Sequence, residues 1–315
     1  MPLPPEYRAF VAACPTAAVW HRAELLTCFG TEARGGDWDA AACRDGGGRL
    51  VAALPFYRKR RVDGRVVAMP APVRYLGPVF DGTYVAEVGF AEAYRRVMAA
   101  LPGDLRSFDQ AWSPQLPPPG VALAGAGYRS ASRPTYLVDL AGGPEALARR
   151  PNKSMRKRLR RAERYWACAP EALTGAAHDV LEASLRRAGV EVGYRRVELD
   201  AGLVALGEAG VVHVARHPDG EIGAVSVAIA DAATGYCWLS GSTLRARERD
   251  GGSYVLWRDV CWAQARGCAQ VDFLGSALPG PAENRRQLGG KLTTYPYVYR
   301  DKAIWTRALR WWRRQ

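Results

Sequence analysis

Basic residues gather in one segment of this chain, at the spacing of a single helix face. Between Arg149 and Arg164 there are nine Lys or Arg residues and one acidic residue, Glu163. Like charges at this spacing repel one another, so a helix that accepts them is expected to bind an anion. Phosphates of a nucleotide-linked substrate, a cofactor or tRNA would supply that anion. The cations that recur every three or four residues are at positions 153, 156, 157, 160, 161 and 164.

The same segment has a second interpretation, because charge runs are usually solvated surface faces. Only 5 of the 44 basic residues are Lys, so Arg at one position is weak evidence for bidentate recognition. The segment carries +8 of the formal net charge of +13, which leaves the rest of the chain only mildly basic. The interpretation as an anion site assigns binding to Lys153, Arg156 and Arg160.

Polar or flexible residues also stand at the ends of three expected elements. Asp272 ends an expected strand, and open α/β sheets bind ligands at the carboxyl ends of their strands. Ser240 ends another strand, and Arg285 precedes Gly289 and Gly290, whose backbone can approach a ligand closely. Each group has a structural alternative: Asp272 can cap the loop that follows it, and the glycine pair can end a helix that exposes Arg285.

Metal binding and covalent catalysis are not indicated. The seven cysteines have no CxxC spacing, and the four histidines do not join them in a ligand pattern. No Ser-His-Asp arrangement can be argued for Ser240 or Ser242. The chain has no run of about 18 apolar residues and no signal-peptide pattern at its start. We therefore expect no metal ion, free thiols and a cytoplasmic protein.

Two stretches of the chain repeat one order of elements that would position these residues. Each reads as a hairpin, a helix, a glycine stop and a strand in which an Asp adjoins a Phe, and the Pro-rich segment 113–120 separates them. This pattern predicts an α/β fold of two tandem units with mixed, mainly antiparallel sheets flanked by helices. The expected domains are 1–130 and 131–315, and the second carries the basic segment and the expected active site.

Three passages resemble the GNAT-like acyltransferases of the FemAB type, which fuse two acetyltransferase-like domains. They are TYLVDL with NKSMRKRLRRAER (152–164), ARGCAQVDFLGS (265–276) and NRRQLGGKLTTYPYVY (284–299). The resemblance is good over about 131–300 and only architectural before that. It implies two GNAT domains and transfer of an acyl or aminoacyl group to an amine acceptor, either a small molecule or a peptide. The implied donor is an acyl-CoA or an aminoacyl-tRNA.

The resemblance also implies roles for single residues. Arg285 takes the place of a family Lys beside the donor site, where it would hold phosphate or stabilise the tetrahedral oxyanion. Asp272 would orient the amine or accept its proton. Single-domain acetyltransferases hold the coenzyme A pyrophosphate with an R/Q-x-x-G-x-G/A loop that opens a helix. Here the loop reads RERDGG (247–252), and the carboxylate of Asp250 at the first glycine position opposes a phosphate.

Two other classes of function stay open. A catalytically inactive, RNA-binding protein with an acyltransferase fold would also explain the basic helix. The terminal segment 303–315 separates apolar from cationic residues at helical spacing, which fits a membrane-surface acyltransferase acting on a lipid-linked precursor. Alternatively, the tryptophans of this segment pack on the domain.

Overall fold

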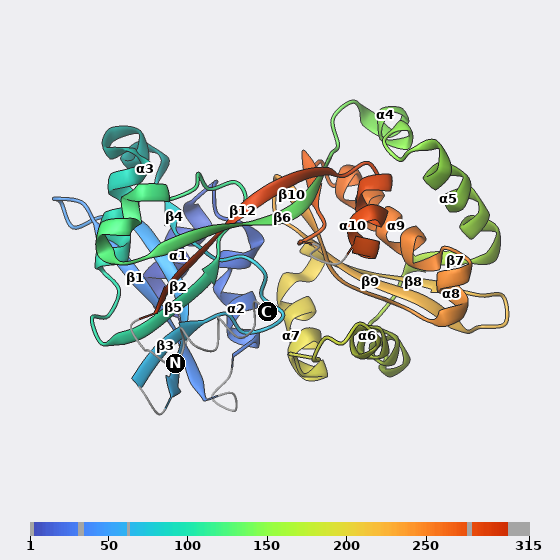
Figure 1. Cartoon of the computed structure of the whole chain (residues 1–315), viewed down its shortest axis with the longest axis horizontal. Coiled ribbons are helices and arrows are strands. Elements are labelled where there is room, and N and C mark those ends of the chain that lie inside the picture. Colours follow the sequence, from blue (N-terminus) through green and yellow to red (C-terminus); the bar gives the residue numbers. More distant parts are fainter. Residues whose placement is uncertain (1–2, 31–34, 62–63, 276–278, 302–315) are drawn as a thin grey trace. The chain divides into compact units, whose positions relative to one another are not determined.

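The chain forms two compact units, each built on a mixed sheet (Figure 1). The computed structural model describes residues 3–30, 35–61, 64–275 and 279–301. Unit 1 comprises Met1–Arg133 with Thr294–Gln315, and unit 2 comprises Pro134–Thr293. From the sequence we expected residues 131–315 to form the second domain. In the structure, Thr294–Gln315 belong to unit 1 instead. The predicted helix at 303–315 lies outside the described residues.

The sheet of unit 1 has the strand order β1-β2-β3-β5-β12. All neighbours in this order are antiparallel except β3 and β5, which are parallel, and the short β4 pairs with β2. These strands are β1 (Gly36–Arg44), β2 (Leu50–Arg61), β3 (Gly64–Ala68), β4 (Val79–Phe80), β5 (Leu105–Ala111) and β12 (Lys291–Asp301).

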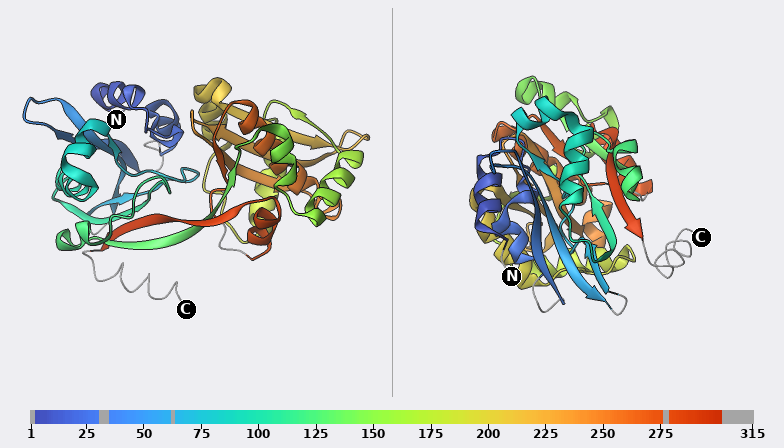
Figure 2. Two further views of the ribbon diagram at one scale, coloured as in Figure 1. Left: turned by 90° about the horizontal axis from the view of Figure 1, so that it is seen from above. Right: turned by 90° about the vertical axis from the view of Figure 1, so that its left-hand side faces the viewer.

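Helices cover both faces of this sheet (Figure 2). Successive residues of a strand point to opposite faces: Phe56 is buried in the core beneath α3, whereas Tyr57 packs against Gly30, just after α2. The helix α3 is broken at Gly89, whose φ of 74° is not helical. The helical elements of unit 1 are α1 (Pro5–Ala13), η1 (Val19–His21), α2 (Ala23–Cys28), α3 (Gly82–Ala99) and η3 (Gly120–Ala126).

The sheet of unit 2 has the strand order β6-β11-β10-β9-β8-β7. Only β10 and β11 are parallel, and the other neighbouring strands are antiparallel. These strands are β6 (Arg129–Asp139), β7 (Ala167–Pro170), β8 (Gly210–Arg216), β9 (Ile222–Ala230), β10 (Thr234–Ser242) and β11 (Gln270–Asp272).

The longer helices of unit 2 lie on both sides of its sheet. Figure 1 shows α4, α5 and α9 on one side and α6 and α7 on the other. Gly235 of β10 contacts Ala263 of α9, and Gly241 contacts Leu181 of α6. The helical elements are α4 (Gly143–Arg149), α5 (Lys153–Tyr165), α6 (Gly175–Arg187), α7 (Arg196–Leu206), η4 (Gly207–Ala209), α8 (Leu244–Glu248), α9 (Gly251–Ala265) and α10 (Pro279–Gln287).

The two units repeat one topology, as the sequence predicts. In unit 1 the hairpin β2–β3, the helix α3 and the parallel strand β5 are followed in the sheet by antiparallel β12. In unit 2 the hairpin β9–β10, the helix α9 and the parallel strand β11 are followed by antiparallel β6. Each sheet is therefore closed by a strand from a distant part of the chain. The pairing of β12 with β5 explains why the units differ from the domains expected from the sequence.

Beneath α9 lies a buried polar cluster of Asp259, His213 and Ser226, each 2% exposed or less. Asp259 Oδ1 lies 2.7 Å from His213 Nδ1 on β8, and Ser226 on β9 donates its hydroxyl to Oδ2. Burial raises the pKa of the Asp259 carboxyl, and the hydrogen bonds from His213 and Ser226 act against this rise. The cluster ties α9 to the two strands beneath it.

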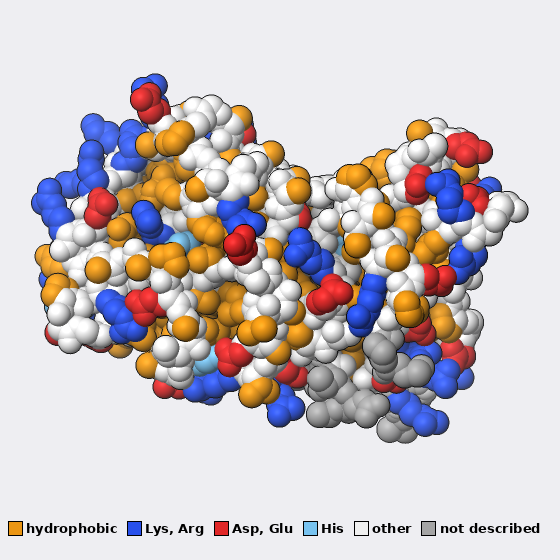
Figure 3. Space-filling view, turned by 180° about the vertical axis from the view of Figure 1, so that it is seen from behind, with side chains coloured by type: hydrophobic (Ala, Val, Ile, Leu, Met, Phe, Trp, Pro, Cys, Tyr) orange, Lys and Arg blue, Asp and Glu red, His pale blue; other side chains and the backbone are white. Residues whose placement is uncertain are grey.

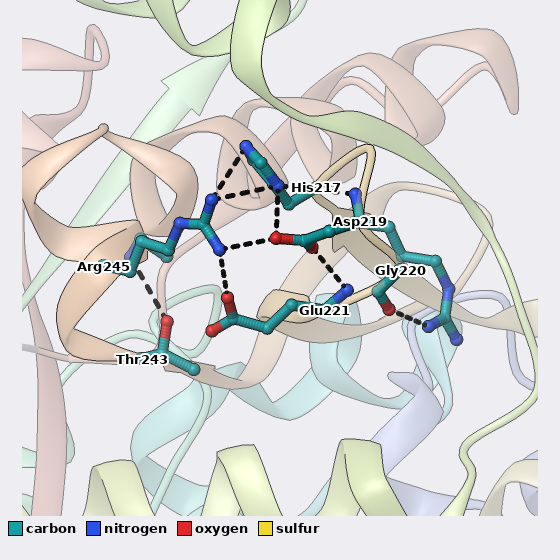
Figure 4. A network of polar contacts seen from close by, with 8 residues as sticks. His217, Asp219, Gly220, Glu221, Thr243 and Arg245 are labelled. Atoms are coloured by element: carbon teal, nitrogen blue, oxygen red, sulfur yellow. Dashed lines mark hydrogen bonds and ion pairs between the residues drawn. The ribbon is translucent and has the colours of Figure 1, made fainter.

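An exposed ion-pair network joins the β8–β9 turn to α8 (Figure 4). Arg245 of α8 lies 2.9 Å from an Asp219 oxygen and 2.5 Å from a Glu221 oxygen. It also lies 3.0 Å from both ring nitrogens of His217. The network fixes α8, the helix that leads into the start of α9.

Acidification is expected to weaken this network between about pH 4 and pH 2. The backbone N–H of Glu221, and then Arg245 and His217, lower the pKa of Asp219 to about 2. Because this value is below that of an unfolded Asp, about 3.9, the stabilisation is present above pH 4 and is lost as the pH falls through 2. An NMR titration of Arg245→Met should show the pKa of Asp219 closer to normal. The control Arg247→Met should leave it unchanged, and an unchanged pKa in Arg245→Met would contradict the assignment.

Candidate active site

The sheet of unit 2 opens between β10 and β11, a feature that we call the β10–β11 split. The two strands pair only over 234–236 and 270–272, and β10 continues beyond the last pair to Ser242. A bulge between Cys237 and Leu239 alters the register of β10 at this point. Ser240 is exposed although Leu239 and Gly241 are buried. The structure thus places the predicted site residue Ser240 at an accessible position within the sheet.

The first turn of α9 adjoins this split. A Cβ added at Gly252 would come within 3.4 Å of Ser242 Oγ at the end of β10. The first N–H groups of a helix have no intrahelical partner and carry partial positive charge. Trp166 supports this turn, because its indole N–H donates to the Arg249 carbonyl at 3.1 Å and its ring packs against Gly251.

Asp272 ends β11 and is fully buried. Its Oδ1 accepts hydrogen bonds from Thr135 Oγ1 at 2.5 Å and from the Leu274 N–H at 2.7 Å. Thr135 Oγ1 in turn accepts from the Gly275 N–H at 2.9 Å. Leu274 has a φ of 57°, which is uncommon for a residue other than glycine, and these bonds hold it there. The contacts support the structural alternative, in which Asp272 fixes the loop beside the split. Its role toward an amine stays a prediction.

Arg285 lies half-buried on α10. The charge of Arg285 affects the thiol of Cys237, at the bulge of β10. Burial raises the pKa of this thiol, Arg285 lowers it and Asp272 raises it further. Both predicted catalytic residues therefore lie within electrostatic range of the same part of β10. What the two residues do at the β10–β11 split stays a prediction.

Gly289 and Gly290 end α10. The N–H groups of these glycines donate to the carbonyls of Arg286 and Arg285 at 3.1 and 3.0 Å. Gly289 has a φ of 97°, and a Cβ there would lie 2.8 Å from Arg150 Cβ. These contacts support the interpretation as a helix end that packs against its neighbours. A ligand contact at these glycines stays a prediction.

The basic helix α5 begins after Asn152, whose side chain accepts from the Met155 N–H at 2.8 Å. Its apolar residues Met155, Leu159 and Ala162 are buried. The opposite face exposes four cations that form no ion pair with another described residue: Lys153, Lys157, Arg160 and Arg164. Figure 3 shows Lys and Arg side chains gathered over the α5 side of unit 2. We call these four residues the α5 cation row.

Arg156 differs from the other predicted anion ligands. Its Nη1 donates to the carbonyls of Arg149, at 3.3 Å, and of Pro151. Arg156 therefore holds the junction between α4 and α5, whereas Lys153 and Arg160 remain on the solvent face.

The inner side of α5 binds the carboxylate of Asp250 at the start of α9. We call Asp250 and the side chains joined to it through Arg158 and Arg161 the Asp250 cluster. The Asp250 side chain is 4% exposed, and Arg158 Nε donates to its Oδ1 at 2.7 Å. Arg161 donates to its other oxygen. Arg158 Nη1 also donates to Gln287 of α10 at 3.0 Å, and Nη2 lies 3.4 Å from Ser253 Oγ. One guanidinium thus joins α5, α9 and α10.

Arg158 does not share the outer face of α5, so the spacing of the cations did not indicate it as a functional residue. A signal was nevertheless present. A carboxylate at a glycine position of the loop needs a cation when it is buried, and an arginine off the outer face of a basic helix can supply one.

Within the described ranges, no three His, Cys, Asp or Glu side chains are grouped to hold a metal ion. None of the helices described has both the length and the apolar character to cross a membrane.

Comparisons with known proteins agree with this architecture. Residues 149–284 match the model of the acetyltransferase (GNAT) domain. The crystal structure of FemX is 12% identical, covers 93% of this chain and 94% of its own, and has a TM-score of 0.68. The C-terminal domain of a putative lysylphosphatidylglycerol synthetase from Agrobacterium fabrum is 14% identical, with coverages of 96% and 93% and a TM-score of 0.58. A tandem GNAT protein from the clavulanic acid biosynthesis pathway is 14% identical, with coverages of 95% and 93% and a TM-score of 0.51.

A search of curated protein sequences finds no match to the chain. The similar structures show that the chain has a FemAB-like tandem GNAT fold. With the match of residues 149–284 to the GNAT domain, this fold points to an acyltransferase, as the sequence predicts.

A GNAT domain implies coenzyme A, whose pyrophosphate would lie at the start of α9. The residues of this chain do not fit it there. Asp250 places a buried carboxylate at that point, and Arg158 and Arg161 are paired with it. No step of the reaction proposed below uses coenzyme A.

Proposed function

We propose that the protein transfers an aminoacyl group from an aminoacyl-tRNA to an amine acceptor, a small molecule or a peptide, at the β10–β11 split. The α5 cation row is the observation that favours aminoacyl-tRNA as the donor. Its four cations lack carboxylate partners among the described residues, and they follow one helix face over about 16 Å. Such a row matches the repeated phosphates of an RNA backbone better than one small anion.

The chemistry needs no covalent intermediate with the protein. The amine nitrogen bonds to the ester carbonyl carbon, the C–O bond to the tRNA ribose breaks, and the proton that the amine loses ends on the leaving ribose oxygen. This direct attack needs a positioned amine and a group that stabilises the oxyanion. Arg285 supplies positive charge for the oxyanion. Asp272 holds the loop that borders the split, and the exposed hydroxyl of Ser240 is available to orient the acceptor.

Transfer is tested with labelled aminoacyl-tRNA and with labelled acetyl-CoA as the comparison donor. The acceptors are lysine-containing peptides and, because one similar structure is named a putative lysylphosphatidylglycerol synthetase, vesicles of phosphatidylglycerol. We expect transfer from aminoacyl-tRNA to a peptide amine and none from acetyl-CoA. Tight, salt-sensitive RNA binding without any transfer would support the RNA-binding alternative instead. Transfer to the vesicles alone would support the lipid-directed alternative.

Arg285→Ala is expected to lower kcat about 100- to 1,000-fold, the usual effect of removing one oxyanion-stabilising group. The donor KM should change little, because the α5 cation row remains. The control is Arg286→Ala, since Arg286 is exposed and paired with Glu283 on the same helix. Steady-state kinetics with the aminoacyl donor measures both values. Equal kcat values for Arg285→Ala and the unchanged protein would remove Arg285 from the mechanism.

A further inference from the structure

The backbone at Asp250 has a conformation that is typical of glycine. Asp250 precedes the first turn of α9 with a φ of 59° and a ψ of 15°, in the left-handed region. Glycine adopts this region readily, and Asp enters it at some cost. The loop thus keeps a glycine-like shape at the position where single-domain acetyltransferases have glycine, while carrying a charged side chain.

The carboxylate of Asp250 and the guanidinium groups beside it satisfy one another. Asp250 Oδ1 accepts from Arg158, Oδ2 accepts from Arg161, and the side chain is 4% exposed. Arg158 directs Nε to Asp250, Nη1 to Gln287 and Nη2 to Ser253. A phosphate that approached the first turn of α9 would meet a carboxylate and an arginine whose nitrogens are already occupied.

On its other side, the first turn of α9 is packed so closely that it has little room to move away from a bound phosphate. A Cβ at Gly251 would lie 3.0 Å from Ala246 Cβ and 3.2 Å from Trp166 Nε1. Asn284 of α10 donates to Ser253 Oγ at 2.6 Å, so α10 also closes on the first turn of α9. A ligand phosphate at this turn would have to replace the Asp250 carboxylate rather than lie beside it.

We infer that Asp250 determines donor specificity: as an internal carboxylate it takes the place of a ligand pyrophosphate and excludes coenzyme A from unit 2. It follows that Arg158 and Arg161 form a latent phosphate site, which opens when the carboxylate is removed. This inference sharpens the proposed choice of donor. Its test measures only equilibrium binding, so it does not depend on the proposed transfer reaction.

The experiment compares the unchanged protein with Asp250→Gly, using inorganic pyrophosphate and coenzyme A as probes in calorimetric titrations. Glycine suits the positive φ at this position, so the loop is expected to keep its shape. Circular dichroism and thermal unfolding check the fold. We expect no binding of either probe by the unchanged protein at millimolar concentration. Asp250→Gly should gain about 100-fold in affinity, because two freed guanidinium groups each form charge-assisted hydrogen bonds to phosphate.

A second variant and two controls keep the test decisive. Asp250→Asn keeps the side-chain size but not the charge, and it should bind pyrophosphate more weakly than Asp250→Gly and more tightly than the unchanged protein. Adding Arg158→Met and Arg161→Met to Asp250→Gly should abolish the gain. Asp219→Asn removes an exposed carboxylate of the same unit, paired with Arg245, and should gain nothing.

Two results would overturn the inference. One is coenzyme A binding by the unchanged protein with the affinity of Asp250→Gly. The other is folded Asp250→Gly and Asp250→Asn proteins that bind neither probe. If aminoacyl transfer from tRNA is absent while Asp250→Gly gains the coenzyme A site, the proposed reaction fails and the inference about Asp250 stands.

Discussion

Replacing Lys157 and Arg160 by glutamate is expected to lower the affinity for tRNA about 100-fold at about 0.15 M salt. Both residues belong to the α5 cation row, are exposed and form no ion pair with another described residue. Reversing a charge removes an attraction to phosphate and adds a repulsion, so the effect exceeds that of neutralisation. The slope of log affinity against log salt should also become shallower by about two, one for each phosphate that the variant no longer neutralises.

Filter binding of tRNA at several salt concentrations measures both quantities. The matched control reverses Arg106 and Arg129 of unit 1, which are exposed and form no ion pair with another described residue. It changes the net charge of the chain by the same amount. If the two double variants lose affinity equally, the effect is one of overall charge, and α5 is a solvated face rather than a binding site.

Asp259→Ala is expected to destabilise unit 2 by about 3–5 kcal/mol, because it breaks a buried, hydrogen-bonded pair and leaves one partner in place. His213 and Ser226 would be left without their shared carboxylate, at positions 2% exposed or less. The helix α9 would lose its polar tie to β8 and β9. Since α9 begins at the β10–β11 split, activity should fall with the loss of folded protein.

Urea unfolding followed by circular dichroism measures this change. Removing His213 as well should cost less than the sum of the two single changes, because the double variant leaves no unpaired partner between these residues. The exposed carboxylate of Asp219 provides the control, and Asp219→Ala should have a much smaller effect. If Asp259→Ala lowers the free energy of unfolding by less than about 1 kcal/mol, the cluster of Asp259, His213 and Ser226 contributes little to stability.

Local sequence patterns predict the elements well where one pattern repeats over several residues. The helix expected in the second repeat is α9, Gly251–Ala265, and the hairpin expected before it is β9–β10. Apolar periodicity and a glycine stop define such elements without reference to the rest of the fold. The partner of β5 could not be predicted in this way, because no local pattern in β12 indicates which of two sheets it completes.

The candidate site shows the same limit. Arg156 and Arg158 are two positions apart on α5, so they project in different directions around the helix. Spacing alone predicted an anion ligand at Arg156, and its Nη1 donates to backbone carbonyls. Arg158 acquires its role only from the placement of Asp250 and Gln287 on two other helices. Long-range packing therefore decides which cation binds a carboxylate and which faces solvent.

The pairing of β12 with β5 affects how the chain can fold during its synthesis. About 180 residues separate the end of β5 from the start of β12, which pairs with it. At a synthesis rate of about 5–20 residues per second, β5 waits roughly 10–40 s for this neighbour. During that time one edge of β5 lacks its final partner and remains open to incorrect pairing. The first unit to leave the ribosome is therefore the last to be completed.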